Sequence, residues 1–131
     1  RTRTGVTSIL CNAVQAASAG AAAACARLLG GDLAACQRAI ELTLASVAGT
    51  LCDGAKPGCS LKVGLGASRA LRCASLAIAG LGPTVRDGLI GADLEQTLAN
   101  LGDLSAGLGE AEERVLRIVL DKQARQAGPV T

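Results

Sequence analysis

Apolar residues recur along the chain at the spacing of helix faces, and glycines and prolines divide it into about five such stretches. The first stretch, residues 6–29, is rich in alanine and ends before two glycines, which readily adopt the left-handed backbone that terminates helices. In the second, residues 33–48, Ile40, Leu44 and Val47 follow at spacings of four and three, the period of one helix face. The pattern therefore predicts that the chain begins with two adjacent helices.

Three further stretches are also predicted to be helical: residues 61–79, 93–105 and 110–125. Asp32 and Asp93 stand where the second and fourth helices would begin, and a carboxylate there can accept a hydrogen bond from the first helical turn. Gln96 follows Asp93 at the spacing of a capping box. Residues 80–91 carry no helical pattern, and we expect a loop there.

The composition limits what can fill the interior, because the 131 residues include no Phe, Trp, Tyr, Met or His. Small aliphatic side chains and cysteines fill only thin spaces, which suits closely packed helices better than two sheets about 10 Å apart. We therefore expect one all-α domain over residues 1–125, followed by a frayed tail at residues 126–131. The domain is predicted to be a compact bundle of about five helices with a central, buried, Ala-rich first helix.

Four-residue repeats of small side chains in the first helix indicate where neighbouring backbones approach most closely. The pairs Gly20 with Ala24 and Ala21 with Cys25 have this spacing. A leucine in place of Ala21 is therefore expected to overpack a helix contact.

Charge and residue types exclude several classes of function. Thirteen basic and eleven acidic residues give a formal charge of +2, and the basic residues are scattered, so we expect no binding to nucleic acid. Without His or aromatic side chains, the chain has no imidazole for metal binding or proton transfer and no ring for base stacking. Any reaction must use Cys, Asp, Glu, Lys, Arg or a bound cofactor.

Residues 5–26 contain no charged side chain and are long enough to cross a bilayer, which requires about 20 residues. Polar residues interrupt this stretch, most of its apolar residues are alanine, and neither aromatic belts nor basic flanks accompany it. We interpret it as a helix buried in protein and expect no membrane contact. No signal peptide is recognisable, so we expect a cytoplasmic location. The chain also lacks Met, and we expect it to be part of a longer protein.

Six cysteines in so short a chain can form disulfides, fill small buried spaces or bind metal. Cys52 and Cys59 bracket a loop with Gly and Pro, and Cys11 lies near the start of the first helix. Zinc would require a fourth ligand, whereas three thiolates can hold an iron–sulfur cluster that leaves one iron open to substrate. Spacing alone does not decide between these possibilities. The other three lie inside helical stretches beside Ala or Leu and are interpreted as small buried side chains: Cys25, Cys36 and Cys73.

Residues 51–63 carry a specific resemblance to a known family. Their sequence, Leu-Cys-Asp-Gly-Ala-Lys-Pro-Gly-Cys-Ser-Leu-Lys-Val, resembles the signature of the iron–sulfur L-serine dehydratase alpha-subunit and L-cysteine desulfidase family. The Ala-rich run through Cys11 is similar to the helix that bears the family's first cluster cysteine. Residues 87–90 and 93–101 are similar to its late helices, so the resemblance extends over residues 6–122.

The resemblance implies a [4Fe–4S] cluster held by Cys11, Cys52 and Cys59, with the fourth iron binding a small amino-acid substrate and polarising its leaving group. It also implies an α,β-elimination without pyridoxal phosphate, which gives pyruvate and ammonia from L-serine, and hydrogen sulfide as well from L-cysteine. The six residues between Cys52 and Cys59 are more similar to the desulfidase branch. The C-terminal cysteine typical of serine dehydratases is absent from the sequence.

Members of this family also carry an N-terminal half with a catalytic cysteine and substrate-binding loops, which this chain lacks. The chain resembles the C-terminal, cluster-binding part alone, and we expect it to be inactive by itself. Close to the loop only Asp53, Lys56 and Lys62 can move a proton. Lys62 and Asp53 are weak catalytic candidates, because an Asp can instead brace the turn and a Lys can remain solvated.

Two other functions stay open at this point. A helical packing or oligomerisation domain without a cluster predicts a folded protein that is indifferent to chelators. A secreted, disulfide-bonded bundle predicts three bridges and no free thiol. For the lyase we expect an apolar patch beside the loop of residues 52–59, covered either by a second copy of the chain in a homo-oligomer or by the missing N-terminal half.

Overall fold

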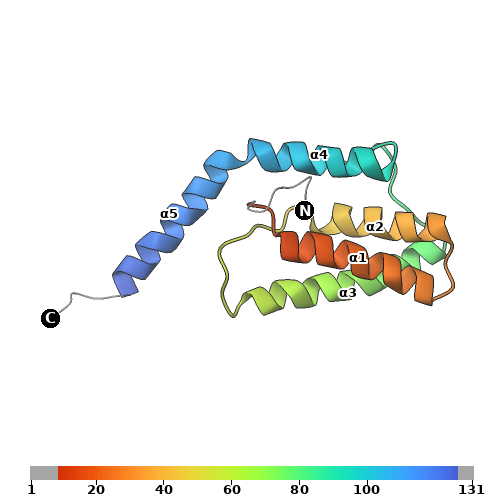
Figure 1. Cartoon of the computed structure of the whole chain (residues 1–131), viewed down its shortest axis with the longest axis horizontal. Helices are drawn as coiled ribbons and strands as arrows, with labels where there is room; N and C mark the ends of the chain where they lie inside the picture. The colour runs from red at the N-terminus through yellow and green to blue at the C-terminus, as the bar shows by residue number, and fades with distance from the viewer. Residues whose placement is uncertain (1–8, 127–131) are drawn as a thin grey trace.

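The computed structural model describes residues 9–126 as an all-α protein (Figure 1). Within that range the only extended pairing is one isolated antiparallel bridge, between Leu10 and Leu51. The predicted fold class is confirmed. The helices are α1 (Asn12–Leu28), α2 (Leu33–Val47), α3 (Cys59–Ile78), α4 (Leu94–Gly107) and α5 (Gly109–Gln126).

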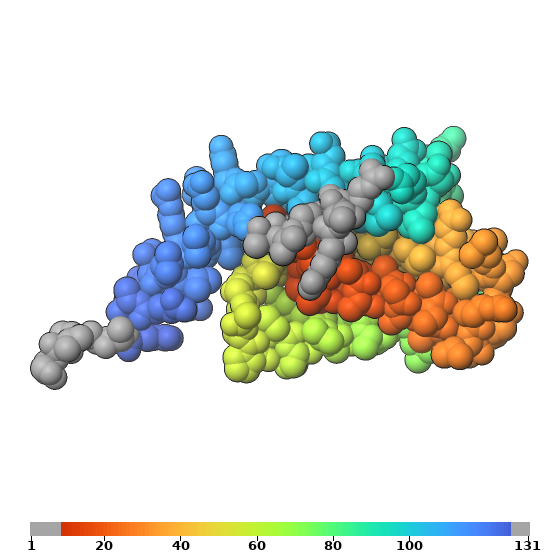
Figure 2. All heavy atoms as spheres, in the orientation of Figure 1, coloured from red at the N-terminus to blue at the C-terminus, as the bar shows by residue number. Residues whose placement is uncertain are grey.

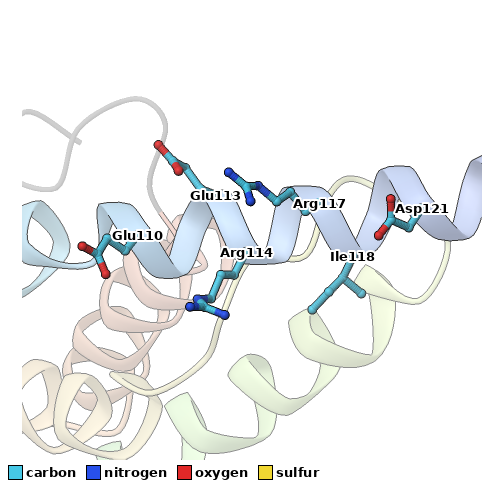
Figure 3. Close-up of a pocket in the computed structure, with 6 residues that line it drawn as sticks. All are labelled: Glu110, Glu113, Arg114, Arg117, Ile118 and Asp121. Atoms are coloured by element: carbon cyan, nitrogen blue, oxygen red, sulfur yellow. The ribbon is translucent and has the colours of Figure 1, made fainter.

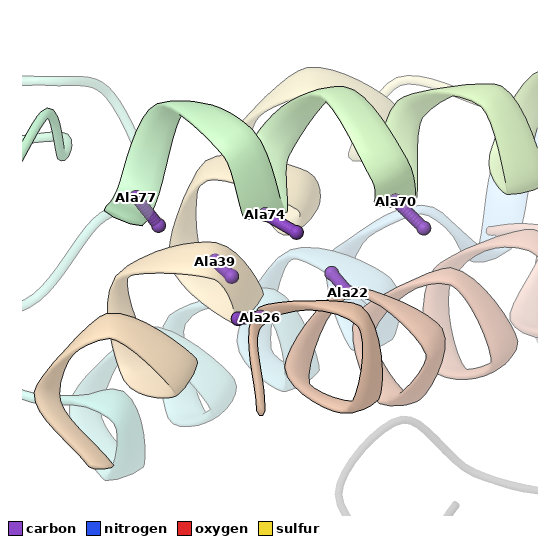
Figure 4. Close-up of a cluster of buried hydrophobic side chains, with 6 residues drawn as sticks. All are labelled: Ala22, Ala26, Ala39, Ala70, Ala74 and Ala77. Atoms are coloured by element: carbon purple, nitrogen blue, oxygen red, sulfur yellow. The ribbon is translucent and has the colours of Figure 1, made fainter. Parts of the chain in front are cut away.

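Helices α1, α2 and α3 pack against one another in a three-helix bundle (Figure 1). Its centre is a layer of alanine side chains, and Figure 4 shows the methyl groups of α3 pointing towards those of α1 and α2. Such small side chains let the helix backbones approach closely, as the absence of aromatic residues predicts. The layer consists of Ala22, Ala26, Ala39, Ala70, Ala74 and Ala77, each at most 1% exposed.

The buried face of α1 differs from the predicted one. Val14, Ser18, Ala22 and Ala26 face the bundle at four-residue spacing. Ala21 is exposed instead, and a Cβ added at the exposed Gly20 would meet nothing within 4 Å. The predicted contact through Ala21 is therefore wrong. Neighbouring residues point about 100° apart around a helix, so the small residues of the Ala-rich run form several similar stripes that spacing does not distinguish.

The turn between α1 and α2 follows the predicted signals. Gly30 has a φ of +89°, and the amide of Gly31 donates to the carbonyl of Ala26 at 2.8 Å, which closes α1 with a Schellman motif. Asp32 then accepts a hydrogen bond from the amide of Ala35 at 2.7 Å and begins α2. This tight connection returns the chain along α1 to the end where α1 began.

Two helix starts differ from the prediction. Helix α1 begins at Asn12 rather than near residue 6, because Leu10 pairs with Leu51 and Cys11 occupies the N-cap position. Residues 1–8 lie outside the described residues. Helix α3 begins at Cys59, two residues earlier than expected.

Helix α4 lies along α2, and α5 leads away from the bundle (Figures 1 and 2). The predicted loop before α4 and its capping box are confirmed: Asp93 accepts from the amide of Gln96 at 2.8 Å, and Gln96 accepts from the amide of Ala92 at 2.7 Å. No residue of α5 is buried. The predicted tail lies outside the described residues except for Gln126, the last residue of α5. None of the described helices is long and apolar enough to span a membrane.

Candidate functional site

Cys11, Cys52 and Cys59 line a single cavity of about 430 Å³ at one end of the three-helix bundle. In the sequence, 40 residues separate the first of them from the second. They meet because α1 runs away from this end and α2 returns to it. Among the described residues no three Cys, Asp or Glu side chains converge on the position of a single metal ion. The shared feature of the three thiols is therefore the cavity.

Backbone hydrogen bonds hold Cys11 beside Cys52. The amide of Cys11 donates to the carbonyl of Thr50 at 2.8 Å, and the amide of Cys52 donates to the carbonyl of Ile9. These bonds form the bridge that keeps α1 from beginning before residue 12. Cys11 is buried at 7% exposure, whereas Cys52 is exposed.

The loop of residues 52–59 folds back so that Cys59 joins the same cavity. Gly54 has a φ of +89°, a conformation that glycine adopts without strain. Its carbonyl accepts a hydrogen bond from the thiol of Cys59 at 3.3 Å. The amide of Cys59 donates to the carbonyl of Lys56 at 2.9 Å, which begins α3. The half-buried Cys59 is thus fixed by both its backbone and its thiol.

Two lysines surround the loop carboxylate. Asp53 forms ion pairs with both Lys56 and Lys62, and Lys62 also donates to the carbonyl of Leu51 at 2.8 Å. Hydrogen bonds from Lys56 and then Lys62 hold the pKa of Asp53 well below its usual range. The hydrogen bond to Asp53 raises the pKa of Lys62. Both groups therefore stay charged near neutral pH, an arrangement that favours bracing over proton transfer.

The donor set matches an iron–sulfur cluster in kind. Three sulfur donors come from three separate segments and open onto one space, and thiolates are the ligands that hold such clusters. Leu10, Ala13 and Val63 add apolar surface to the wall. Three protein donors also leave one iron of a four-iron cluster without a protein ligand.

The other three cysteines lie at the opposite end of the bundle. Cys73 is buried at 4% exposure, and Cys25 and Cys36 pack half-buried against the alanine layer. All six cysteines are free thiols, so nothing supports a disulfide-bonded bundle. The interpretation of these three as small packed side chains agrees with their positions.

Helix α5 supplies neighbours of the loop that the sequence pattern did not indicate. A hollow of about 230 Å³ lies between Cys52 and Asp53 on one side and Glu112, Val115 and Val119 on the other. The amphipathic pattern of α5 predicted a helix but carried no signal of where that helix would lie. A further hollow of about 460 Å³ follows α5 alone (Figure 3). Its described lining comes from one helix, so a molecule there would be held from one side only.

Apolar side chains beside the loop are exposed, as expected. They are Leu51, Leu61, Val63 and Leu65, with exposed fractions of 45%, 78%, 49% and 48%.

A family model described as serine dehydratase alpha chain matches residues 1–117. The chain is 41% identical over 120 residues to a UPF0597 protein of Nitratidesulfovibrio vulgaris, which covers 91% of this chain and 27% of the relative. It is 41% identical over 121 residues to a UPF0597 protein of Desulfatibacillum aliphaticivorans, covering 92% and 28%. A UPF0597 protein of Clostridium perfringens is 37% identical over 120 residues, covering 91% and 28%.

The chain thus spans little more than a quarter of the length of these relatives. No solved structure matches it. The family match extends over the three segments that carry the cavity cysteines and over the first half of α5. The chain belongs to the serine dehydratase alpha chain family.

Proposed function

We propose that this chain is the cluster-binding domain of an iron–sulfur lyase that eliminates the β-substituent of a small L-amino acid. The observation that carries the proposal is the cavity shared by Cys11, Cys52 and Cys59, which come from three segments of the fold. Membership of the serine dehydratase alpha chain family supports the same class of reaction.

In this proposal the three cysteine thiolates hold a [4Fe–4S] cluster. When bound, the cluster supplies a Lewis-acidic iron that polarises the leaving group of the substrate. Leu10 and Val63 give the cavity an apolar wall beside the thiols. Lys62 and Asp53 neutralise each other, so the base that removes the α-proton lies elsewhere.

The substrate we favour is L-cysteine, because six residues separate the loop cysteines, as is more typical of the desulfidase branch. With water, its elimination yields pyruvate, ammonia and hydrogen sulfide. L-serine, which yields pyruvate and ammonia, is the second choice. The relatives are more than three times as long as this chain, and we propose that a further part of such a protein provides the base and the groups that orient the carboxylate. The chain alone is then inactive.

A non-catalytic helical module without a cluster is the alternative. It is favoured by α5, which has no buried residue and exposes Leu116, Ile118 and Leu120 at more than half of their surface. Such a helix can serve association as readily as it can serve an enzyme.

Anaerobic reconstitution of the chain with iron and sulfide distinguishes the two. We expect about four iron and four sulfide per chain, with the broad visible absorption of a cluster. Serine at Cys11, Cys52 or Cys59 should reduce the bound iron severely, whereas serine at Cys73 serves as the matched control and should retain it. A colourless wild-type chain that binds no iron would contradict the proposal and favour the non-catalytic module.

A further inference from the structure

Lys62 connects the helix that begins at Cys59 to the segment that carries Cys52. It lies on α3 three residues after Cys59, on the same side of the helix. Its ammonium donates to the carbonyl of Leu51 at 2.8 Å and pairs with the carboxylate of Asp53. The two groups that it contacts directly precede and directly follow Cys52.

The same segment is already joined to Cys11. The amides of Cys11 and Cys52 bond to the carbonyls of Thr50 and Ile9. One side chain on α3 therefore completes a connection among all three segments of the cavity. The lysine is about three-quarters buried, with 26% of its side chain exposed.

We propose that Lys62, paired with Asp53, is a positioning residue that keeps the three cysteines at one cavity before any cluster binds. The role of Lys62 in preparing a cluster site rests on the function proposed above. The contacts by which Lys62 joins the three segments do not depend on that function. Removal of a group that contacts and orients a metal ligand commonly lowers metal affinity about 10- to 100-fold.

Lys56 provides the contrast that makes the proposal specific. It pairs with the same carboxylate, but it lies within the loop, three residues after Asp53, and its side chain is 47% exposed. Its ion pair therefore links the loop to itself and not to α3. Loss of Lys56 removes one cation from Asp53 and leaves the connection to α3 intact.

Electrostatics support the same role. The pKa of Lys62 is raised by its hydrogen bond to Asp53 and, to a smaller degree, by the charges of Cys11 and Cys59. The ammonium thus lies within electrostatic reach of two of the three sulfurs. Its charge is held chiefly by Asp53, in agreement with a role in positioning.

The first test uses the full chain without iron. The rate at which iodoacetamide alkylates Cys11 under native conditions is measured by mass spectrometry, with the buried Cys73 in the same sample reporting global unfolding. Lys62→Met should accelerate alkylation of Cys11 on the order of tenfold relative to Cys73. Lys62→Arg should restore most of the protection, and Lys56→Met should resemble wild type.

Asp53→Asn removes the ion pair from the loop side and leaves the hydrogen bond from Lys62 to Leu51. It should therefore accelerate Cys11 by a smaller factor, about two- to threefold, which keeps the test decisive if Lys62→Met folds poorly. Equal alkylation of Cys11 in wild type and in both variants would overturn the proposal. So would equal acceleration of Cys11 and Cys73 in both, because the connection would then be no more than general stability.

The second test loads each variant with iron and sulfide and follows the transfer of iron to a chelator. Release from Lys62→Met should be about 10- to 100-fold faster than from wild type, with Lys62→Arg close to wild type. Equal release rates would overturn the positioning role and leave the proposed function standing. If the wild-type chain acquires no iron, the proposed function fails, and the alkylation test still decides whether Lys62 positions Cys11.

Discussion

The two ends of the three-helix bundle each hold three cysteines, and they are built from different contacts. At one end Cys11, Cys52 and Cys59 stand where helices begin or a loop turns, and backbone hydrogen bonds and ion pairs fix them. At the other end Cys25, Cys36 and Cys73 lie within helices, beside the alanine layer. The same residue type therefore serves packing in one place and is available for chemistry in the other.

This difference concerns the forces that maintain each end. Each alanine buries little apolar area, so the layer derives its stability from the close approach of three helices and tolerates little added volume. The thiol end depends on directional bonds and on the charges of Asp53 and Lys62. The stability of the packed end should depend most on side-chain volume, and that of the thiol end on side-chain charge.

Added volume in the alanine layer should give the largest effect on stability. Ala22→Leu places a branched side chain at a position with 0% exposure and should cost about 1–3 kcal/mol of unfolding free energy. Ala21→Leu, one residue away on the exposed face, is the matched control and should change it by less than about 0.5 kcal/mol. Urea denaturation of both variants measures the difference. Equal losses would show that the layer is not the contact that joins the helices.

The helices could be predicted from the sequence because their signals are local. Glycines after α1, aspartates before α2 and α4, and apolar spacing each act within one or two turns, so the boundaries mostly agree with expectation. The start of α1 could not be predicted, because Leu10 is held by Leu51 from a distant part of the chain. The prediction of which alanine stripe of α1 faces inward was wrong for a related reason. The side chains of the stripes are nearly identical, so contacts with the partner helices decide which stripe is buried.

The candidate site could be predicted in part. The two loop cysteines and their order along the chain indicated the segment, and the turn from α1 into α2 explains why Cys11 meets them. The ion pairs of Lys62 could not be foreseen, because they depend on how α3 lies against the segment of Leu51. The position of α5 beside the loop carried no sequence signal, since its pattern specifies a face but not a partner.

Substitution of two glycines of α3 tests where the close packing ends, and the expected effect on stability is smaller. A Cβ at Gly66 would clash with the hydroxyl of Ser18 and lie 3.3 Å from Val14, whereas one at Gly64 would meet nothing within 4 Å. Gly64→Ala should stabilise the chain by about 0.5–1 kcal/mol, because alanine favours the helix. Gly66→Ala should lower the free energy of unfolding by about 0.5–2 kcal/mol, although alanine favours the helix there as well. Thermal denaturation of the pair gives the comparison, and the same sign for both would place the limit of close packing elsewhere.

The charge at the thiol end should give the smallest effect, and it should depend on pH. Folding lowers the pKa of Asp53 from its ordinary value of 3.8. The stabilising contribution of Asp53 is therefore complete above pH 3.8 and is lost as the pH falls through the folded pKa. The pKa of Lys62 is raised from 10.5, so its contribution is complete below that value and is lost as pH rises through the folded pKa. Asp53→Asn should therefore lower Tm by about 1–2 °C at pH 7, because a partly exposed ion pair is worth little and Lys62 keeps its hydrogen bond to Leu51. The difference from wild type should shrink as the pH falls below about 3.8, because the unfolded chain then holds a proton on Asp53 that folding must release. It should also shrink in 1 M salt, which screens charges beyond about 3 Å. If the difference in Tm stayed constant from pH 7 to pH 2, the asparagine would destabilise the chain through altered shape or hydrogen bonding and not through the lost charge. The thiol end would then be held by packing, like the alanine end, and the contrast between the two would not hold.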